Sequence, residues 1–332
     1  MASEILPSDL LYEIFSRLPV KSLFRFRCVS SVCRSIIDDP YLAYMHQTRS
    51  LKSYNLECGC NGLSCFTKVS DKSSVVLFNP LREQVLSLPP TPAAFPSQRP
   101  SPPLEEGKIK YGLGFDCSKN TYKIVRVFDD ESSSTNFYVE VLTLGTSSWK
   151  AISKGPPCLL FKSPVFVHGN IHWLSYPEED AYEGHPGFTK IVSFDVSKEE
   201  FGLIYPPKFR ECHLLDLKGN LAIVDSSSIY RPHIDIWVLK EYERKDYWVK
   251  EYEIDLNPTR RQFMVFNNLL IEVVGLLEFG RVLILRNRGQ FISCDPKTGR
   301  LRDIYIPRFG CYTDVLSCHK GNLLSISKFE AN

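Results

Sequence analysis

The fold of this 332-residue chain is decided by two stretches, VFVHGNIHWLS at 165–175 and IVSFDVSKEEFGLIYPP at 191–207. Each alternates apolar and polar residues on both sides of a turn, which is typical of two β-strands joined in a hairpin. The first hairpin carries a Gly-Asn turn at Gly169 and Asn170, and the second turns after Asp195. Together the two stretches predict one sheet of four short strands.

Both kinds of hairpin recur along the chain. The Gly-Asn turn appears again at Gly219 and Gly321, with a variant at Gly62. The second kind has Asx or Thr, a large apolar residue six positions later, and Ile, Val or Leu three positions after that. It starts at Asn79, Asp116, Thr143, Asp195 and Asp295. Because the offset is constant, we expect Asp195 and Asp295 to cap their turns by hydrogen bonding.

The strand groups begin near residues 110, 163, 212, 264 and 312. This spacing of about 50 residues is close to the repeat of kelch-type propeller blades. A β-sandwich would also contain many short strands, but it would not repeat the same two hairpins at a fixed period. We therefore predict an all-β, propeller-like domain over residues 55–328 with five or six blades, in which 312–327 could complete a blade begun by 56–89.

Composition and charge exclude several classes of protein. The chain is 43% apolar and 23% charged, as soluble globular proteins are, and its net charge of +2 gives no reason to expect binding to nucleic acid or a membrane surface. The longest apolar stretch, NNLLIEVVGLLEFG, is interrupted by Glu272, and the N-terminus lacks the basic flank and apolar run of a signal peptide. We expect a cytoplasmic or nuclear location, or both.

The tightest group of the eleven cysteines is Cys58, Cys60 and Cys65. A structural metal site needs four ligands at recognised spacing, and this group has no CxxC pair and no nearby histidine. We expect reduced cysteines buried in strands, with a metal site as the alternative.

The stretch PPTPAAFPSQRPSPP at 89–103 cannot be a central strand and is expected to link two blades, or to dock on a partner as a Pro-rich peptide.

Residues 1–48 have a helical pattern instead. Steps of three and four between apolar residues predict helices at about 8–17, 20–26 and 28–37, with a possible short one at 41–48. Leu10 and Leu11 are adjacent, as are Ile14 and Phe15, so the first helix is apolar on more than one side. Three short helices rarely bury this much apolar surface among themselves. The surplus is covered either by the C-terminal domain or by a partner protein.

The stretch LPSDLLYEIFSRLPVKSLFRFRCVSSVCRSIIDDPYLAYMH at 6–46 resembles an F-box. The strand repeats LFNPLREQVLSLP, YGLGFD with YKIVRV, and HGNIHWLS resemble the kelch-like F-box-associated domain of plant F-box proteins. The resemblance implies an α+β chain of two domains: a three-helix F-box, then the propeller. It also implies that the F-box binds a Skp-family adaptor, which attaches to a cullin scaffold carrying a RING protein and the ubiquitin-conjugating enzyme.

The resemblance implies that residues at particular positions contact the adaptor. These positions are Leu6, Pro7, Leu10, Ile14, Leu18, Pro19, Leu23, Val29 and Cys33. The family commonly has tryptophan where this chain has Cys33, and a thiol supplies less apolar area, so either neighbours compensate or adaptor binding is weaker. For Leu11 and Phe15 we expect packing within the helical domain.

No constellation of catalytic residues is recognisable. There is no GxxxxGK[ST] phosphate loop and no GxSxG nucleophile elbow, and GLGFD at 112–116 lacks the third glycine of a dinucleotide loop. His168 and His172 flank a strand turn and are expected to be structural, and the four tryptophans to pack within or between blades. We therefore predict a non-enzymatic chain with no cofactor and no metal.

Three interpretations of function remain. The first is a substrate-receptor subunit of a ubiquitin ligase, which captures the target protein with its propeller loops. The candidate loops are 129–136, 177–187 and 226–233, with Tyr230 and Arg231 as exposed anchors. The second is a β-propeller interaction scaffold whose helices pack on its own body. The third is a propeller enzyme with a metal or carboxylate site in its central channel.

Overall fold

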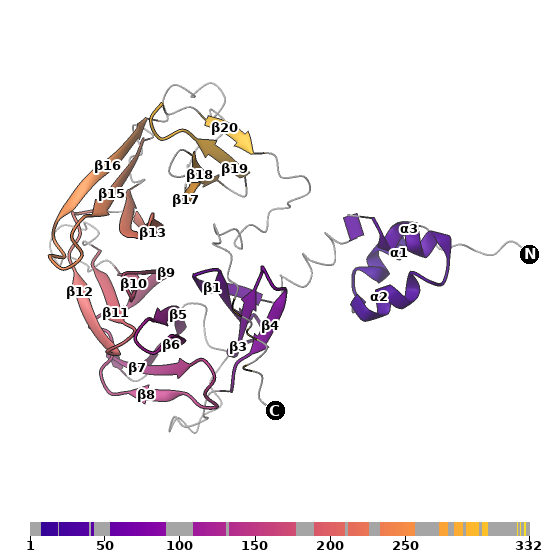
Figure 1. Cartoon of the computed structure of the whole chain (residues 1–332), viewed down its shortest axis with the longest axis horizontal. Helices are drawn as coiled ribbons and strands as arrows, with labels where there is room; N and C mark the ends of the chain where they lie inside the picture. The colour runs from indigo at the N-terminus through magenta and orange to yellow at the C-terminus, as the bar shows by residue number, and fades with distance from the viewer. Residues whose placement is uncertain are drawn as a thin grey trace, which may run out of the picture.

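A computed structural model describes residues 8–18, 20–39, 41–42, 54–90, 109–130, 133–176, 189–209, 212–225, 233–255, 272–277, 282–287, 290–298, 301–304, 324, 326 and 329. These residues form a small helical unit near the N-terminus and a much larger strand-rich domain (Figure 1). Among the described helices, none is both long enough and apolar enough to cross a membrane.

The helical unit contains three short helices, α1 (Ser8–Phe15), α2 (Val20–Phe26) and α3 (Ser31–Ile37). They match the three predicted helices, with small differences at the ends. α3 begins three residues later than predicted because Ser30 caps it: Ser30 Oγ accepts a hydrogen bond from the backbone N–H of Cys33 at 3.0 Å. Of the predicted helix at 41–48, residues 41 and 42 are described and are helical.

The described strands form five antiparallel sheets of four strands, and we number these sheets blades 1 to 5. Blade 1 contains β1 (Tyr54–Cys60), β2 (Leu63–Lys68), β3 (Asp71–Asn79) and β4 (Gln84–Ser87). Blade 2 contains β5 (Ile109–Asp116), β6 (Thr121–Asp130), β7 (Ser133–Thr143) and β8 (Lys150–Ile152). Blade 3 contains β9 (Leu160–Val167), β10 (Asn170–Ser175), β11 (Ile191–Asp195) and β12 (Glu200–Ile204). Blade 4 contains β13 (Cys212–Leu217), β14 (Asn220–Asp225), β15 (His233–Leu239) and β16 (Trp248–Asp255). Blade 5 contains β17 (Glu272–Leu277), β18 (Val282–Asn287), β19 (Gln290–Cys294) and β20 (Leu301–Ile304).

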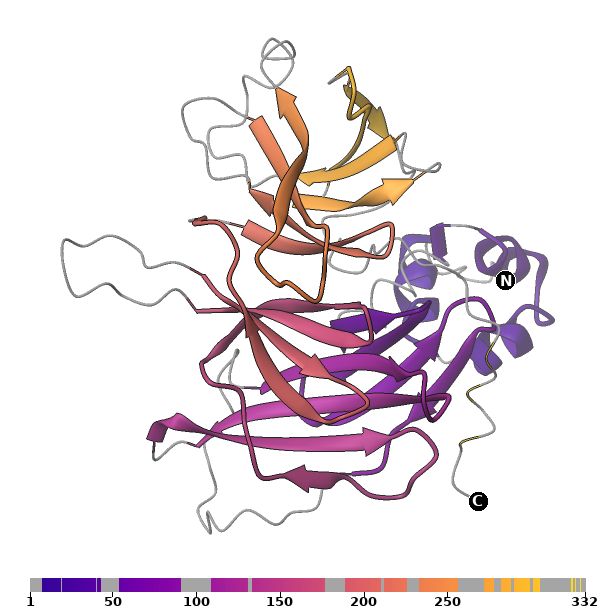
Figure 2. The same ribbon diagram turned by 60° about the vertical axis from the view of Figure 1, so that its left-hand side comes forward.

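The blades follow one another around an arc, and the first strand of each blade lies beside the first strand of the next (Figure 1). In Figure 2 blades 4 and 5, in orange and yellow, lie at one extreme of this arc. Radially arranged four-stranded sheets with inner first strands are the architecture of a β-propeller. The predicted propeller-like fold is therefore confirmed, and the five described sheets agree with the expected five or six blades.

Two predicted strand groups begin outside the described residues. Blade 5 is described from Glu272, so the group predicted near 264 begins outside the described residues, as does the group near 312. Blade 1 already has four strands from residues 54–87. The C-terminal residues do contact it, since Asn79 Nδ2 donates to the Leu324 carbonyl at 2.7 Å and the Ile326 N–H donates to Gln84 Oε1 at 2.9 Å.

Short turns of the two predicted kinds join the strands. Asp195 Oδ1 accepts hydrogen bonds from the backbone N–H groups of Ser197 (2.9 Å) and Lys198 (2.8 Å), and Asp295 forms the same kind of turn. The turn-capping prediction is thus confirmed for both aspartates. The Gly-Asn hairpins turn one residue earlier than predicted. At 168–169 both residues have positive φ angles, 51° and 71°, as a two-residue type I′ turn requires, and Asn170 already belongs to β10.

The domain has two different ends. In an antiparallel blade, the links from strand two to strand three and from strand four to the next blade leave at one end, which we call the long-loop end. The turns from strand one to strand two and from strand three to strand four lie at the opposite end, which we call the tight-turn end. Contacts between blades align these ends: Lys162 Nζ donates to the Cys212 carbonyl at 2.8 Å between the starts of β9 and β13. The Val273 N–H donates to His213 Nε2 at 3.1 Å between blades 4 and 5.

Apolar side chains fill the seams between neighbouring blades. Between blades 2 and 3 the buried cluster includes Val125, Trp173 and Phe194. Glycine is required beside this cluster, because a Cβ atom at Gly112 would lie 2.5 Å from the Trp173 ring. The stretch GLGFD is part of the inner strand β5, in agreement with the prediction that it is not a dinucleotide loop. The other three tryptophans pack in the seams between blades 1 and 2 and between blades 3 and 4, as expected.

His172 lies in the seam between blades 3 and 4 and is fully buried. Its Nδ1 lies 3.3 Å from the Val165 carbonyl, and its Nε2 lies 2.8 Å from the Tyr242 hydroxyl. Since a carbonyl only accepts hydrogen bonds, Nδ1 carries the proton and Nε2 accepts from Tyr242. Burial lowers the pKa of His172 to about 3, with smaller contributions from His168 and Lys245. The imidazole is therefore neutral and structural, as predicted.

This buried imidazole predicts a loss of stability in acid. Below about pH 6.5 the unfolded chain binds a proton at His172 that the folded chain excludes, so the free energy of unfolding falls by about 1.4 kcal/mol per pH unit until the folded pKa is approached. In His172→Gln this contribution is absent. The free energy of unfolding is measured by urea denaturation followed by tryptophan fluorescence, which reports on the strand domain. The difference in this free energy between wild type and variant should shrink as the pH is lowered from about 5.5 to about 4. If the free energy of unfolding depended on pH in the same way in wild type and in His172→Gln, the burial of a neutral His172 would be contradicted.

Candidate partner-binding sites

The first helix, α1, has two apolar faces, and the helical unit covers only one of them. Leu11, Phe15 and Leu18 point toward α2 and α3, and Phe15 is only 3% exposed. Leu10 and Ile14 lie one turn apart on another side of α1, where they are 50% and 44% exposed. The predicted surplus of apolar surface on α1 therefore lies at these two residues.

The core of the helical unit is small. It consists of Phe15, Leu23, Ile36 and Leu42, with five partly buried apolar residues packed around them. All members of this cluster belong to residues 11–42, so the helices pack on one another. In Figure 1 the helices stand to one side of the sheets. The packing predicted for Leu11 and Phe15 is thus observed.

Exposed apolar side chains are concentrated on this unit. Among the described residues, seven of the sixteen exposed large apolar side chains lie within residues 10–41. They are Leu10, Ile14, Phe24, Phe26, Val29, Val32 and Tyr41. Soluble proteins rarely expose so much apolar surface on a small unit unless another protein covers it. The helical unit is therefore the stronger candidate for a protein-binding site.

The structure places the predicted adaptor-binding residues in different settings. Leu10, Ile14 and Val29 are exposed, so a partner can reach them. Leu18 and Cys33 are partly buried against the helical core. For Cys33 this position means that the small thiol contributes to packing within the unit as well as to its surface.

The remaining predicted positions contribute less to the surface. Leu23 is part of the core, which gives it a packing role within the unit. Leu6, Pro7 and Pro19 lie outside the described residues. The sequence comparison with the F-box motif did not single out Phe24, Phe26, Val32 and Tyr41, which are all exposed.

Polar contacts hold the three helices in one arrangement. Arg27 Nε and Nη2 donate to the two carboxylate oxygens of Asp38 at 2.6 and 2.9 Å, joining the end of α2 to the end of α3. These hydrogen bonds lower the pKa of Asp38. The Tyr12 hydroxyl of α1 donates to Asp39. The exposed Arg27–Asp38 ion pair adds little stability, but it and the Tyr12–Asp39 hydrogen bond restrict how the helix ends lie and so shape the surface in advance of binding.

The long-loop end of the strand domain is the second candidate site. The predicted target-contacting segments 177–187 and 226–233 fall between the second and third strands of blades 3 and 4, so the flanking strand ends lie at this end. The loop predicted at 129–136 is wrong for most of its length, because β6 extends to Asp130 and β7 begins at Ser133. Tyr230 and Arg231 lie outside the described residues. Among described residues, Tyr176 and Tyr205 are exposed at the long-loop end of blade 3.

The described residues contain no cluster of three or more His, Cys, Asp or Glu side chains that could hold a metal ion. Cys58, Cys60 and Cys65 are free thiols buried in blade 1, as predicted. Burial raises the pKa of Cys58 and of Cys60, so both remain protonated and unreactive. These side chains stabilise the fold and offer no nucleophile.

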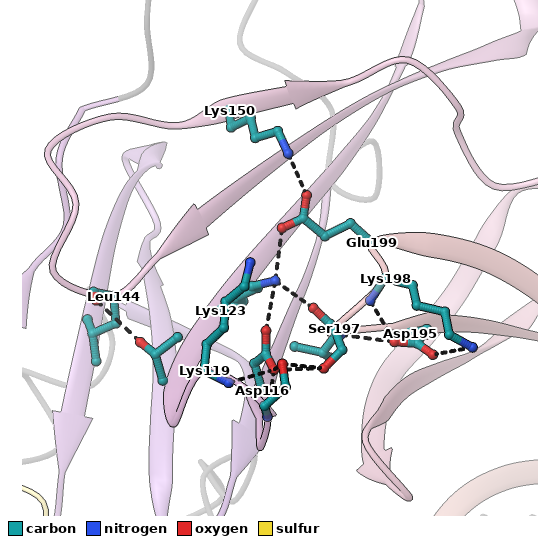
Figure 3. Close-up of polar contacts among 12 residues, drawn as sticks. Asp116, Lys119, Lys123, Leu144, Lys150, Asp195, Ser197, Lys198 and Glu199 are labelled. Carbon is teal, nitrogen blue, oxygen red and sulfur yellow. Dashed lines mark hydrogen bonds and ion pairs between the residues drawn. The ribbon is translucent and has the colours of Figure 1, made fainter.

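An ion-pair network in the seam between blades 2 and 3 was not predicted (Figure 3). Lys123 on β6 is fully buried; its Nζ donates to the Val196 carbonyl at 2.7 Å and pairs with Glu199 (2.9 Å) and Asp116 (3.1 Å). Lys150 pairs with the other oxygen of Glu199 at 2.8 Å. The signal was available in the sequence, because strand alternation in YKIVRV puts Lys123 on the same face as two buried valines.

The network keeps Asp116 ionised. Burial alone would raise the pKa of Asp116, but hydrogen bonds from Ser118, Ser197 and Lys123 outweigh burial and hold the pKa well below its usual range. Burial alone would lower the pKa of Lys123, but hydrogen bonds to Glu199 and Asp116 and the charges of these two carboxylates outweigh burial and raise the pKa. A buried charge with this many partners is a structural link between blades rather than an acid or base for catalysis.

A small helical unit with an exposed apolar face, followed by a β-propeller, defines a class of two-part binding protein. Residues 24–323 match the model of the F-box associated beta propeller domain. The chain therefore belongs to the F-box proteins that carry an F-box-associated domain, as the sequence resemblance implied.

Several Arabidopsis thaliana proteins are similar over most of their length. F-box protein At3g07870 is 26% identical over 380 residues, which cover 91% of this chain and 87% of the relative. F-box protein CPR1 is 24% identical, covering 80% of this chain and 76% of the relative. F-box/kelch-repeat protein At3g23880 is 26% identical over an alignment that covers 86% of this chain and 89% of the relative. The similarity thus spans both the helical unit and the propeller.

The two faces of α1 predict opposite responses to truncation. Phe15→Ala should unfold the helical unit, because a buried Phe→Ala change costs about 3–5 kcal/mol and Phe15 is one of four buried apolar core residues in the described part of the unit. Leu10→Ala should change the stability of the unit by at most about 0.5 kcal/mol, since Leu10 is exposed. Hydrogen-exchange mass spectrometry of peptides from residues 8–42 in the full chain distinguishes them. Equal loss of protection in the two variants would mean that Leu10 belongs to the core.

Proposed function

We propose that the chain is the substrate-receptor subunit of a Skp–cullin–F-box ubiquitin ligase. In this role the helical unit binds the Skp-family adaptor, and through it the cullin and the RING protein, while the propeller captures a target protein. The observation that carries the proposal is the exposed apolar face of α1 at Leu10 and Ile14, on a unit whose core, among the described residues, comes from its own helices. Membership of the F-box family supports it.

The exposed face is adequate for such an interface. A standard interface buries about 800 Å² on each partner, and its energy is concentrated in a few central apolar side chains. Leu10, Ile14 and Val29 supply such side chains on α1 and after α2. The contacts between Arg27 and Asp38 and between Tyr12 and Asp39 fix the helix ends before binding, which reduces the entropy lost on association.

In the proposed role the chain needs no catalytic group of its own. Holding the target beside the ubiquitin-charged conjugating enzyme raises the local concentration of target lysines, and this proximity is the contribution of the receptor. Buried, protonated thiols and charge-paired carboxylates in the described part of the chain are consistent with a non-catalytic subunit.

We place the target on the long-loop end of the propeller. Loops between second and third strands vary in length there, while the tight-turn end is occupied by two- to eight-residue turns that the strands themselves dictate. The exposed Tyr176 and Tyr205 are of the residue type enriched in binding hot spots. The alternative of a scaffold with self-packed helices requires another surface to cover Leu10 and Ile14. The expected cytoplasmic or nuclear location stays a prediction.

Adaptor binding should depend on the exposed face of α1. We expect Leu10→Ala with Ile14→Ala to weaken binding of a purified Skp-family adaptor about thirtyfold or more, because loss of central apolar anchors costs about 2 kcal/mol or more. The affinity is measured by titration calorimetry with the full chain. The matched control is Leu81→Ala with Val85→Ala, two exposed apolar residues of blade 1, which should bind like wild type. Unchanged affinity in the α1 variant would refute the assignment.

Target capture should depend on the long-loop end. We expect Tyr230→Ala with Arg231→Ala to remove proteins that co-purify with the wild-type chain when cullin and proteasome activity are blocked. The matched control is Tyr247→Ala with Arg244→Ala, an exposed pair of the same residue types on the β15–β16 hairpin at the tight-turn end. Enriched proteins should be lost in the first variant and kept in the second, as quantified by mass spectrometry. The reverse pattern would place target binding at the tight-turn end.

A further inference from the structure

Two serine hydroxyls share one carboxylate oxygen at the tight-turn end of the seam between blades 2 and 3. Ser118 Oγ donates to Asp116 Oδ1 at 2.6 Å, and Ser197 Oγ donates to the same oxygen at 2.7 Å. The two hydroxyl oxygens are 3.3 Å apart. Ser118 belongs to the β5–β6 turn of blade 2 and Ser197 to the β11–β12 turn of blade 3, so Asp116 fastens the two turns together.

Ser118 and Ser197 are both exposed, although the carboxylate that they bind is buried. Ser197 differs from Ser118 in the acidic residues near it. It lies in DVSKEE, where acidic residues occur two positions before it, at Asp195, and two and three positions after it, at Glu199 and Glu200. Glu200 is itself exposed. A serine kinase that selects acidic residues after the acceptor recognises this charge pattern through basic side chains of its own. The sequence SKNT after Ser118 lacks the pattern.

We propose that Ser197 is a phosphorylation site and that its modification opens the seam between blades 2 and 3. The γ-phosphoryl group of ATP is transferred to Ser197 Oγ by an acid-directed serine/threonine kinase. The O–H proton passes to the catalytic carboxylate of that kinase, and ADP leaves. This inference concerns the propeller alone, and it does not depend on the proposed adaptor or target.

Charges around Ser197 explain why the phosphate disrupts the seam. The network balances three carboxylates, Asp116, Asp195 and Glu199, with three lysines, Lys123, Lys150 and Lys198. Phosphorylation removes the proton with which Ser197 binds Asp116 and adds a charge of about −1.5 to −2 beside an ionised carboxylate. Because each of these lysines is already paired, the added charge is left in excess.

The turn cannot move without affecting the apolar seam. Val196, which precedes Ser197, is buried in the cluster between blades 2 and 3, and its carbonyl accepts from Lys123. Its side chain fills the space beside Gly114, where a Cβ atom would lie 2.5 Å away. Displacing Ser197 from Asp116 therefore pulls Val196 away from its packing partners. In Figure 3 Ser197, Asp116 and Lys123 point toward one another from the two blades.

The first experiment tests the site. The purified full chain is incubated with casein kinase 2 and ATP, and the products are located by peptide mass spectrometry. We expect phosphate on the peptide containing Ser197 in wild type and in Ser118→Ala, none in Ser197→Ala, and at least roughly tenfold less in Glu200→Gln, which keeps the hydroxyl but loses the acidic determinant. Phosphorylation of a synthetic 191–204 peptide without phosphorylation of the folded chain would overturn the proposal.

The second experiment tests the opening. Hydrogen exchange is compared between the phosphorylated and unmodified full chain. Amides of β6 and β11 should exchange at least roughly tenfold faster after phosphorylation, while those of β13 and β14 in blade 4 should not change. In Asp116→Asn the effect should be smaller, because the carboxylate that repels the phosphate is absent. Unchanged or slower exchange of β6 and β11 would overturn the opening, since it would mean that the lysines accommodate the phosphate.

Discussion

Packing between neighbouring sheets is the interaction on which the strand domain depends. A four-stranded blade is too small to bury a core by itself, and its strands are apolar on both faces. Adjacent residues of β6 illustrate this: Ile124 packs against blade 1 and Val125 against blade 3, and both are fully buried. Each inner blade thus needs a neighbour on either side. The long-loop end and the tight-turn end do not pack against a neighbouring blade in this way, so the loops there can differ in sequence and length.

Buried polar links complement the apolar seams. Lys123 joins blade 2 to blade 3, His172 joins blade 3 to Tyr242 of blade 4, and His213 joins blade 4 to blade 5. Apolar side chains can slide past one another at small cost, whereas a buried charge or imidazole needs its partner at hydrogen-bonding distance. We infer that these links fix how far one blade is shifted along the next. Their contribution is to alignment more than to net stability.

Local patterns in the sequence were sufficient for the elements and for the turn chemistry. The apolar steps from Leu10 to Leu18 gave the helix and its two faces, and the constant offset after Asp195 gave a capped turn. The covered face of α1 was assigned from the resemblance to an F-box and not from the apolar pattern, because that pattern does not show where Phe15 meets α2 and α3. Leu23 was assigned to a binding surface by motif, while the fold uses it in the core. The link between Lys123 and Val196 joins residues 73 apart in sequence, and no local periodicity reveals such a pair.

The hydrogen bonds from blade 1 to Leu324 and Ile326 have a consequence for synthesis. Asn79 and the Leu324 carbonyl are separated by 245 residues, so blade 1 leaves the ribosome long before its C-terminal partner exists. At about 5–20 residues per second, the delay is roughly 12–50 s. During this interval the hydrogen bond from Asn79 to the Leu324 carbonyl cannot form, and the surface that buries Ile326 is open to water or to a chaperone. The contact between blade 1 and residues 324–326 is therefore among the last contacts of the propeller to form during synthesis.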